Sequence, residues 1–381
     1  MKFLLAPDSF KGSVSAKEAA EAMRRGVLKA RPSARTFTLP LSDGGEGTLE
    51  HLVKATKGTI YETMIEDPLG RPICGYYGVT GDGKTAIVEL ATASGLTLLK
   101  KEELNPRLAS TFGTGQLIMR AMERGIASFI ICLGGSATVD GGAGILQALG
   151  FRLLDHCGEE LPRGGVYLRE LAHIDDLRVD EGIKQAKFRL ACDVTNPLLG
   201  PQGAAYVFGP QKGADKEAIR ELGEALTVWA DQIRHKTGVA VHDMPGAGAA
   251  GGTAAGLCGL LGAEIRPGFA IVSEMLGLER LLDEHSITAV LTGEGRLDAQ
   301  TAGGKVVAGV CAVCAGRGIP VIAVVGGIDG DISPLYGRGL TAAFSLVDGP
   351  LSVEEAMGRA TVLLEKQTEQ IVRVFVKAKG M

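Results

Sequence analysis

The turn that decides the fold reads Leu133-Gly134-Gly135-Ser136-Ala137-Thr138-Val139-Asp140-Gly141-Gly142-Ala143-Gly144. An apolar run at 129–132 precedes it and a helix-like run at 145–149 follows it, which indicates a strand that ends in glycines before a helix begins. Backbone N–H groups in such a turn, and the positive end of the following helix, favour an anion such as phosphate. A tight turn whose glycines serve only close packing is the structural alternative.

The same change from extended segment to glycines to helix recurs along the chain. Further glycine-rich clusters occur at residues 43–47, 112–115, 246–252 and 292–296. Ligands of open α/β sheets bind at the carboxyl ends of strands, where these clusters are expected to lie. Their repetition favours an enzyme that handles phosphate.

Size and charge narrow the class of protein. A chain of 381 residues exceeds the length at which single hydrophobic cores stop growing, so two domains are expected. The formal net charge is −4 and no run of Lys and Arg is longer than a pair, which argues against binding to nucleic acid or to an anionic membrane. The expected partner is a small molecule, and the expected assembly is a monomer or a homodimer.

A cytoplasmic location is expected from the cysteines and the N-terminus. The seven cysteines are dispersed through apolar segments, as in proteins with reduced thiols. The apolar run before Pro7 is too short for a signal peptide. The uncharged segment 246–263 consists mainly of glycine and alanine, so it is interpreted as a loop and a close-packed helix rather than a membrane span.

Short apolar runs that end in polar or glycine-rich turns predict one parallel sheet from residues 2–6, 35–39, 289–291 and 321–325. The expected fold class is therefore α/β, with a doubly wound, Rossmann- or flavodoxin-like domain built from both chain ends, residues 1–66 and 285–381. Residues 67–284 are expected to form an inserted α/β domain with mixed strands. Capping boxes at Ser15–Glu18 and Ser352–Glu355 predict two helix starts, the second helix reaching about residue 377.

Two familiar nucleotide motifs are present as letters but lack their structural context. Residues 78–85 match the P-loop pattern, yet the segment after Lys84 is strand-like where a helix is required, so Asp82-Gly83 is predicted to be a hairpin turn. Residues 246–251 match the dinucleotide fingerprint, but Pro245 directly before them is incompatible with the required strand. These glycines are better explained by a close approach of backbone to a ligand or to another helix.

Phosphoryl transfer needs cations to balance phosphate charge, carboxylates to hold Mg²⁺, and a carboxylate to accept the hydroxyl proton. The polar turns supply all of these. The cationic candidates are Lys11, Lys212, Arg296 and Lys305, and the acidic candidates are Asp8, Asp43, Glu46, Asp140, Asp193, Glu294 and Asp298. Each one taken alone is better explained as a helix cap or a turn former, and it is their recurrence beside glycines and at strand ends that favours a functional site.

Several of these motifs, in the same order, resemble the type-1 glycerate kinases. The resemblance extends from about residue 3 to residue 375 and is carried by residues 6–13, 42–47, 134–142, 193–198 and 292–298. It implies a two-domain α/β kinase without a Walker loop, which uses ATP and Mg²⁺ to phosphorylate (R)-glycerate, mostly at the 2-hydroxyl to give 2-phosphoglycerate.

Individual roles within that chemistry are hypotheses from residue type. Asp193 is the expected proton acceptor, with Lys11 and Asp8 as further catalytic residues. Arg296 is expected to bind the glycerate carboxylate through a bidentate pair, together with Ser9, Ser13 and Asn196. The Mg²⁺ ligands are expected among Asp43, Glu46 and Asp298. The expected nucleotide contacts are Gly134, Gly135, Ser136, Thr138, Gly141, Gly142 and Lys212.

Other functions remain open at this point. A glycerate 3-kinase or a kinase of another small hydroxyacid would have much the same set of residues. A non-catalytic organic-acid binding protein would need fewer carboxylates around its glycine turns. A nicotinamide-dependent dehydrogenase is favoured only by the glycine run at 246–252.

Overall fold

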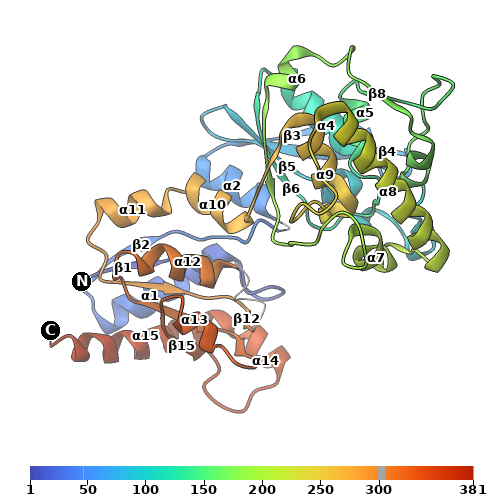
Figure 1. The fold of residues 1–381 in the computed structure, drawn as a ribbon. Helices are drawn as coiled ribbons and strands as arrows, with labels where there is room; N and C mark the ends of the chain where they lie inside the picture. Colours follow the sequence, from blue (N-terminus) through green and yellow to red (C-terminus); the bar gives the residue numbers. More distant parts are fainter. Residues whose placement is uncertain (46, 299–304, 381) are drawn as a thin grey trace. The chain divides into compact units, whose positions relative to one another are not determined.

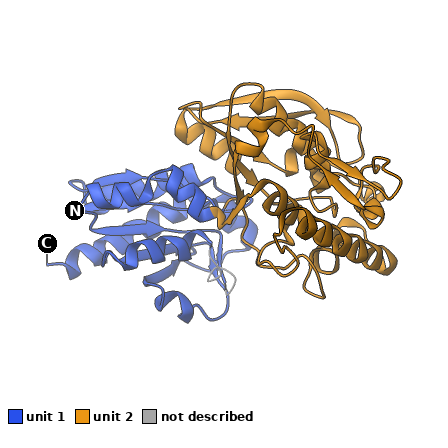
Figure 2. Ribbon diagram, turned by 45° about the horizontal axis from the view of Figure 1, so that its top comes forward, with its two compact units in different colours: residues 1–43, 269–381 blue, residues 44–268 orange. Residues whose placement is uncertain are grey.

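The computed structural model describes residues 1–45, 47–298 and 305–380. It divides into two compact units (Figure 1, Figure 2). Unit 1 comprises residues 1–43 and 269–381, and unit 2 comprises residues 44–268. Unit 1 is thus assembled from both ends of the chain around one sheet.

The sheet of unit 1 is parallel, with the strand order β15-β13-β11-β1-β2. Its strands are β1 (Lys2–Leu5), β2 (Arg35–Thr38), β11 (Ala289–Thr292), β13 (Val321–Val325) and β15 (Leu340–Ser345). From β1 the chain adds β2 on one side, whereas β11, β13 and β15 extend the other side. The winding direction therefore reverses between β1 and β11, which is where ligands bind in sheets of this kind. The predicted doubly wound sheet is confirmed.

Helices cover both faces of this sheet (Figure 1). On one face, α1 (Ala16–Ala30) and α15 (Ala360–Ala378) bury Met23, Val27 and Leu363 against Phe3 and neighbouring strand residues. The other face carries α12 (Val306–Ala315), which packs on β13. The remaining elements of unit 1 are α10 (Gly268–Met275), α11 (Leu278–Glu284), the short pair β12 (Arg296–Leu297) and β14 (Gly327–Ile328), α13 (Ser333–Tyr336) and α14 (Val353–Gly358).

Both predicted capping boxes are present at the starts of α1 and α14. The single final helix expected after Ser352 is, however, two helices. Arg359 has φ −110° and ψ 6°, which is not helical, and it separates α14 from α15. Because of this break, α14 is not a continuation of α15. Residues of α14 line the cavity described below.

Unit 2 contains a mixed sheet with the order β10-β9-β6-β5-β4-β3. β5 (Thr85–Glu89), β6 (Ser128–Cys132), β9 (Lys187–Ala191) and β10 (Glu264–Arg266) are parallel, whereas β3 (Thr59–Glu66) and β4 (Pro72–Val79) join antiparallel. The mixed strands of the inserted domain are as predicted. Its core is closed by helices that include α4 (Phe112–Met122), α5 (Ala143–Ala148), α8 (Lys216–Thr237) and α9 (Ala249–Leu261). The remaining elements are α2 (Thr48–Thr56), α3 (Ala91–Ser94), β7 (Arg152–Leu154), β8 (His173–Asp175), α6 (Glu181–Gln185) and α7 (Ala204–Phe208).

The unit boundaries at 43/44 and 268/269 differ from the expected ones at 66/67 and 284/285. At the first boundary, β3 pairs with β4 from Thr59 to Glu66, so residues before 67 belong to the sheet of unit 2. At the second, Phe269 fills the space beside Gly309 of α12, where a Cβ atom would lie only 2.2 Å from its ring. The helices after residue 268 therefore pack with unit 1.

The P-loop pattern at residues 78–85 is a hairpin, as predicted. Asp82 Oδ1 accepts hydrogen bonds from Thr80 Oγ1 (2.6 Å) and from the backbone N–H of Lys84 (3.1 Å). Strand β5 begins at Thr85, directly after the lysine, and pairs with β4. Across the part of the chain that the structure describes, no helix combines the length and the apolar character needed to span a bilayer.

Candidate active site

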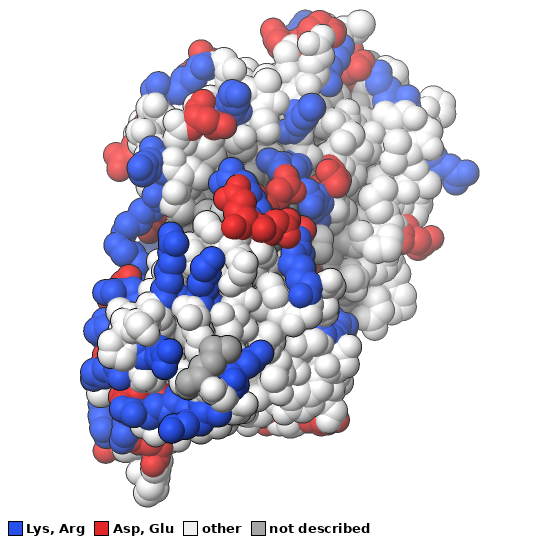
Figure 3. Space-filling model, turned by 90° about the vertical axis from the view of Figure 1, so that its left-hand side faces the viewer, with Lys and Arg blue, Asp and Glu red and all other residues white. Residues whose placement is uncertain are grey.

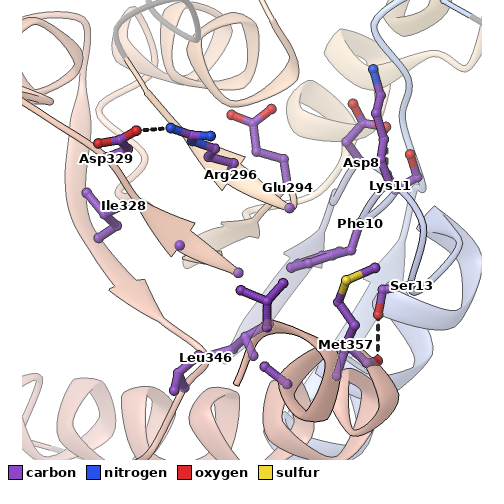
Figure 4. Close-up of a pocket in the computed structure, with 18 of the residues that line it drawn as sticks. Asp8, Phe10, Lys11, Ser13, Glu294, Arg296, Ile328, Asp329, Leu346 and Met357 are labelled. Carbon is purple, nitrogen blue, oxygen red and sulfur yellow. Dashed lines mark hydrogen bonds and ion pairs between the residues drawn. The ribbon is translucent and has the colours of Figure 1, made fainter. Parts of the chain in front are cut away.

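A cavity of about 680 Å³ lies in unit 1 at the carboxyl ends of β1, β11 and β13 (Figure 4). The sequence brings polar groups there because each of these strands ends in a turn of glycine and charged residues. Among the predicted site residues, those that line this cavity are Asp8, Ser9, Lys11, Ser13, Asp43, Arg296 and Asp298. Glu294 and Lys305, which were also candidates, line it too.

Asp8 is the most enclosed carboxyl group of the cavity, with 5% of its surface exposed. The backbone N–H of Asp8 donates to Gly293 O (2.8 Å), which ties the turn after β1 to the turn after β11. The backbone N–H of Ser9 donates to Asp8 Oδ1 (2.6 Å). Burial, and next the charge of Asp43, raise the pKa of Asp8 to about 7, although Ser9 and Lys11 act in the opposite direction. Asp8 therefore changes its protonation state near neutral pH.

Lys11 and Asp43 face each other across the mouth of the cavity. Lys11 Nζ lies 3.7 Å from Asp43 Oδ2, and the lysine side chain is 80% exposed. An exposed ammonium on a flexible stem can move towards an anionic ligand at little cost, because a surface ion pair of this kind contributes little to stability. Glu46, the other acid expected here as a metal ligand, lies outside the described residues.

The guanidinium of Arg296 pairs with the carboxylate of Asp329 (Figure 4). Arg296 belongs to β12 and Asp329 follows β14, and these two short strands are paired. Sequence reasoning missed Asp329, although the signal was available: Gly326-Gly327-Ile328-Asp329 follows β13 in the same pattern of strand, glycines and acid as the other turns.

Ser13, one of the predicted substrate contacts, is bonded to α14. Its hydroxyl donates to the backbone carbonyl of Met357 in α14 (2.7 Å; Figure 4). Gly12, at φ +75°, lies beside the same methionine, whose Cε atom would be 3.1 Å from a Cβ there. The loop that carries Lys11 is thus fastened to α14.

The glycines expected to bind the nucleotide lie in unit 2, in the turn between β6 and α5. In the second half of this turn, most backbone N–H groups donate to other groups of the protein. Asp140 is fully buried and accepts hydrogen bonds from the backbone N–H groups of Gly142 and Gly144, and from the N–H and hydroxyl of Thr111. The N–H of Gly141 donates to Gly251 O (3.0 Å). Gly141 and Gly142 are therefore not positioned to donate to a phosphate, whereas Gly134 and Gly135 at the start of the turn are exposed.

Lys212 is buried beneath this turn with 2% of its surface exposed. Its ammonium donates to Ser136 Oγ (2.6 Å) and to Thr138 O (2.7 Å). Burial lowers the pKa of Lys212 to about 7, and the charge of Asp140 acts in the opposite direction. The buried lysine therefore stabilises the conformation of the turn. Any contact of residues 134–138 with a phosphate would come from the exposed backbone.

The glycine run at 246–252 approaches this turn, as the sequence analysis expected of a close backbone contact. Gly251 has φ +67°, and a Cβ atom there would lie 2.0 Å from Thr138 O. The same residue accepts the N–H of Gly141. The run serves backbone packing at the start of α9, not the strand and helix of a dinucleotide-binding unit.

Asp193 and Asn196 follow β9 in unit 2. Asp193 Oδ1 accepts the backbone N–H of Gly268 (3.0 Å), and Asn196 Nδ2 donates to Gln202 O (2.9 Å). Both side chains thus have partners within their own unit, whereas the residues that line the cavity belong to unit 1.

Charges of both signs are interspersed on the molecular face in Figure 3. Within the described residues, no group of three or more His, Cys, Asp or Glu side chains has the arrangement of a preformed metal site. Mg²⁺ usually keeps several waters and binds through one or two carboxylates together with substrate phosphates. Asp43 and Asp298 line the same cavity and provide such oxygen donors.

The sequence also matches a known family along nearly its whole length. The family model described as "Glycerate kinase family" matches residues 3–376. The chain belongs to the glycerate kinase family. The recognition from sequence motifs is thereby confirmed, and the nicotinamide-dependent dehydrogenase is not supported.

Individual relatives agree with this assignment. The chain is 45% identical to a glycerate kinase of Halalkalibacterium halodurans over 371 residues, which is 97% of each chain. It is 44% identical to the glycerate 2-kinase of Escherichia coli K12 over 356 residues, 93% of each chain. A crystal structure described as glycerate kinase 2 of Salmonella typhimurium LT2 superimposes with a TM-score of 0.90, at 41% identity and with full coverage of both chains.

Proposed function

We propose that this protein transfers the γ-phosphoryl group of ATP to the 2-hydroxyl of (R)-glycerate, giving 2-phosphoglycerate and ADP in a Mg²⁺-dependent reaction. The observation that carries the proposal is the cavity of unit 1, where buried Asp8 lies among cationic and acidic side chains at the reversal point of a doubly wound sheet. Family membership supports glycerate as the acceptor, and the name of the Escherichia coli relative supports the 2-hydroxyl.

Asp8 is the proposed proton acceptor, in place of Asp193. The glycerate hydroxyl oxygen attacks the γ-phosphorus, the bond from that phosphorus to the β,γ-bridging oxygen breaks, and the hydroxyl proton passes to the Asp8 carboxylate. A base is most effective when its pKa lies near the working pH, and the pKa of Asp8 is about 7. Asp193 has no comparable enclosure, because it is exposed and accepts the N–H of Gly268.

The acceptor is held by its carboxylate in this proposal. Arg296 already binds a carboxylate, that of Asp329, and guanidinium groups bind carboxylates through paired hydrogen bonds. We propose that glycerate replaces Asp329 as the partner of Arg296. The exchange keeps the number of charge pairs on Arg296 the same, and it leaves the carboxylate of Asp329, whose side chain is 58% exposed, to be solvated by water.

Asp43 and Asp298 would hold Mg²⁺, and Lys11 and Lys305 would balance the remaining phosphate charge. The metal, when bound, supplies neutralisation of the charge on the β- and γ-phosphate oxygens. Lys11 is suited to its part because it is exposed on a flexible stem yet anchored at its loop by the hydrogen bond from Ser13.

The proposal is tested by mixing the protein with ATP, Mg²⁺ and (R)-glycerate, following ADP release and identifying the product by phosphorus NMR. We expect ADP release that requires both glycerate and Mg²⁺, with 2-phosphoglycerate as the product. A spectrum with 3-phosphoglycerate alone would replace the proposal by a glycerate 3-kinase. Glycerate binding in calorimetry without ADP release under any condition would favour a non-catalytic binding protein.

A further inference from the structure

The cavity of unit 1 has two chemically different halves. In Figure 4, Asp8, Lys11, Glu294, Arg296 and Asp329 lie along one side. The opposite side is formed by the segment after β15, by α14 and by the start of α15, and apart from Ser352 its lining residues are apolar. They include Leu346, Val347, Leu351, Ala356 and Met357, and Phe10 from the loop after β1 extends this apolar surface.

The apolar half has no use in binding a three-carbon acid. Glycerate carries a carboxylate and two hydroxyl groups, so every part of it matches the polar half. A cavity of about 680 Å³ is within the range of about 300 to 1,000 Å³ that larger organic ligands occupy. Covering apolar surface that is open to water is favourable, so this wall suits a partner with a flat apolar face. The adenine of ATP is such a group.

The apolar wall is physically joined to the loop that carries Lys11. Ser13 Oγ donates to Met357 O (2.7 Å), and Phe10 and Val14 exchange backbone hydrogen bonds within the loop (2.7 and 3.0 Å). Phe10 itself is buried and lines the cavity between the polar residues and α14 (Figure 4). A ligand with an apolar end and an anionic end would therefore contact α14 and Lys11 at once.

We propose that the adenosine portion of ATP binds in unit 1, against the wall formed by Phe10, Leu346, Val347, Leu351, Ala356 and Met357, with its phosphates directed towards Lys11. This inference rests on the proposed function, because it takes ATP as the phosphoryl donor. It assigns the adenine to unit 1, whereas the sequence analysis expected contacts to the nucleotide in the glycine turn at 134–142 in unit 2. The internal use of the Gly141, Gly142 and Gly144 N–H groups weakens that alternative.

Photoaffinity labelling of the unmodified protein decides between the two locations. 8-Azido-ATP with Mg²⁺ is irradiated on the protein, and the labelled peptide is identified by mass spectrometry, with excess ATP as the competitor. We expect label that ATP suppresses within residues 346–357. Label within 134–142 instead, or label that ATP does not suppress, would overturn the proposal.

Matched tryptophan variants test the same wall by affinity. Ala356→Trp places a large ring in the apolar half, whereas Val362→Trp places it on α15 at a side chain that is 63% exposed and does not line the cavity. In calorimetric titrations with Mg-ADP, we expect the Kd to rise at least tenfold for Ala356→Trp and less than twofold for Val362→Trp. Met357→Ala is a milder change that replaces this test if Ala356→Trp fails to fold. We expect it to raise the Kd for Mg-ADP several-fold.

The outcomes separate this inference from the proposed function. Equal Kd values for the wild type, Ala356→Trp and Met357→Ala would overturn the adenosine site even if glycerate is phosphorylated. Conversely, ADP binding that Ala356→Trp abolishes would support the site even if glycerate proved not to be the acceptor.

Discussion

Asp8 shows how burial gives an ordinary side chain an unusual protonation state. The carboxyl group is nearly enclosed and lies near Asp43, so its charged form loses solvation and meets a like charge. Both effects raise its pKa, to about 7. An aspartate that is half ionised near neutral pH can accept a proton during the reaction and release it afterwards.

The first prediction concerns the pH dependence of catalysis. Because Asp8 must be ionised to accept a proton, we expect kcat/KM of the wild type to fall as the pH drops through about 7. Asp8→Asn should lower kcat/KM by about a hundredfold or more and should remove this limb of the profile. Steady-state kinetics over a pH series would measure both. A wild-type profile that is flat around neutral pH would contradict the role of Asp8.

The same pKa shift has a consequence for stability, which thermal unfolding can measure. The folded-state pKa of Asp8 lies above the unfolded value, so the folded protein binds more protons between these two values, and stability is lost as the pH rises through about 7. Asp8→Asn removes this effect. We therefore expect the Tm of Asp8→Asn relative to the wild type to be higher at about pH 8 than at about pH 5. The same relative Tm at both pH values would mean that folding does not raise the pKa of Asp8.

Residue type and position in the sequence were enough to nominate Asp8, Lys11, Asp43, Arg296 and Asp298, because each follows a strand or a glycine turn. The partners of these residues could not be predicted in the same way. Ser13 donates to Met357, 344 positions further along the chain, and Arg296 pairs with Asp329. Such pairs depend on the three-dimensional packing of distant segments, about which local patterns carry no information.

At the level of elements, the glycine turn between β6 and α5 depends on a second glycine segment. Gly251 brings the start of α9 so close to Thr138 that no side chain fits between them. Trp229 of α8 donates its indole N–H to Gly141 O (3.0 Å) and closes the turn from another side. Both glycine segments could be recognised in the sequence, but their contact with each other could not. Several backbone N–H groups that were expected to bind a ligand therefore donate to acceptors within the protein instead.

The next prediction tests this close approach. Gly251→Ala introduces both an unfavourable φ of +67° and a collision with Thr138 O, so we expect it to destabilise unit 2 by more than about 2 kcal/mol. Gly262→Ala, at the end of the same helix, has a similar φ of +62° but meets no atom within 4 Å. This control should cost only about 1 to 2 kcal/mol, the strain term alone. Equal losses in urea unfolding would show that the collision is relieved by movement.

For the whole molecule, the sequence contained enough to predict the central sheet of unit 1 from both chain ends. Short apolar runs ending in polar turns identified β1, β11 and β13, because parallel strands buried on both faces lack polar alternation. The edge strand β2, which has no buried residue, was placed in the same sheet. The limits of the units were harder to place. Residues 59–66 look like any strand, and only their pairing with β4 assigns them to unit 2.

In the proposed reaction, phosphoryl transfer takes place at the carboxyl ends of the parallel strands of unit 1, and the P-loop pattern at 78–85 has no part in it. Each location offers a lysine beside glycines. Lys11 lines the cavity, whereas Lys84 is exposed in the hairpin between β4 and β5. Replacing the two lysines separately therefore contrasts two similar local sequences in different structural settings.

The most direct test is the ratio of kcat/KM for Lys11→Ala to that for Lys84→Ala in glycerate-dependent ADP release, with folding checked by circular dichroism. We predict a loss of about a hundredfold or more for Lys11→Ala, the usual scale for removing a charge-stabilising group, and a change of less than about twofold for Lys84→Ala. Collapse of activity in Lys84→Ala together with near-normal activity in Lys11→Ala would contradict the account and place ATP on the hairpin.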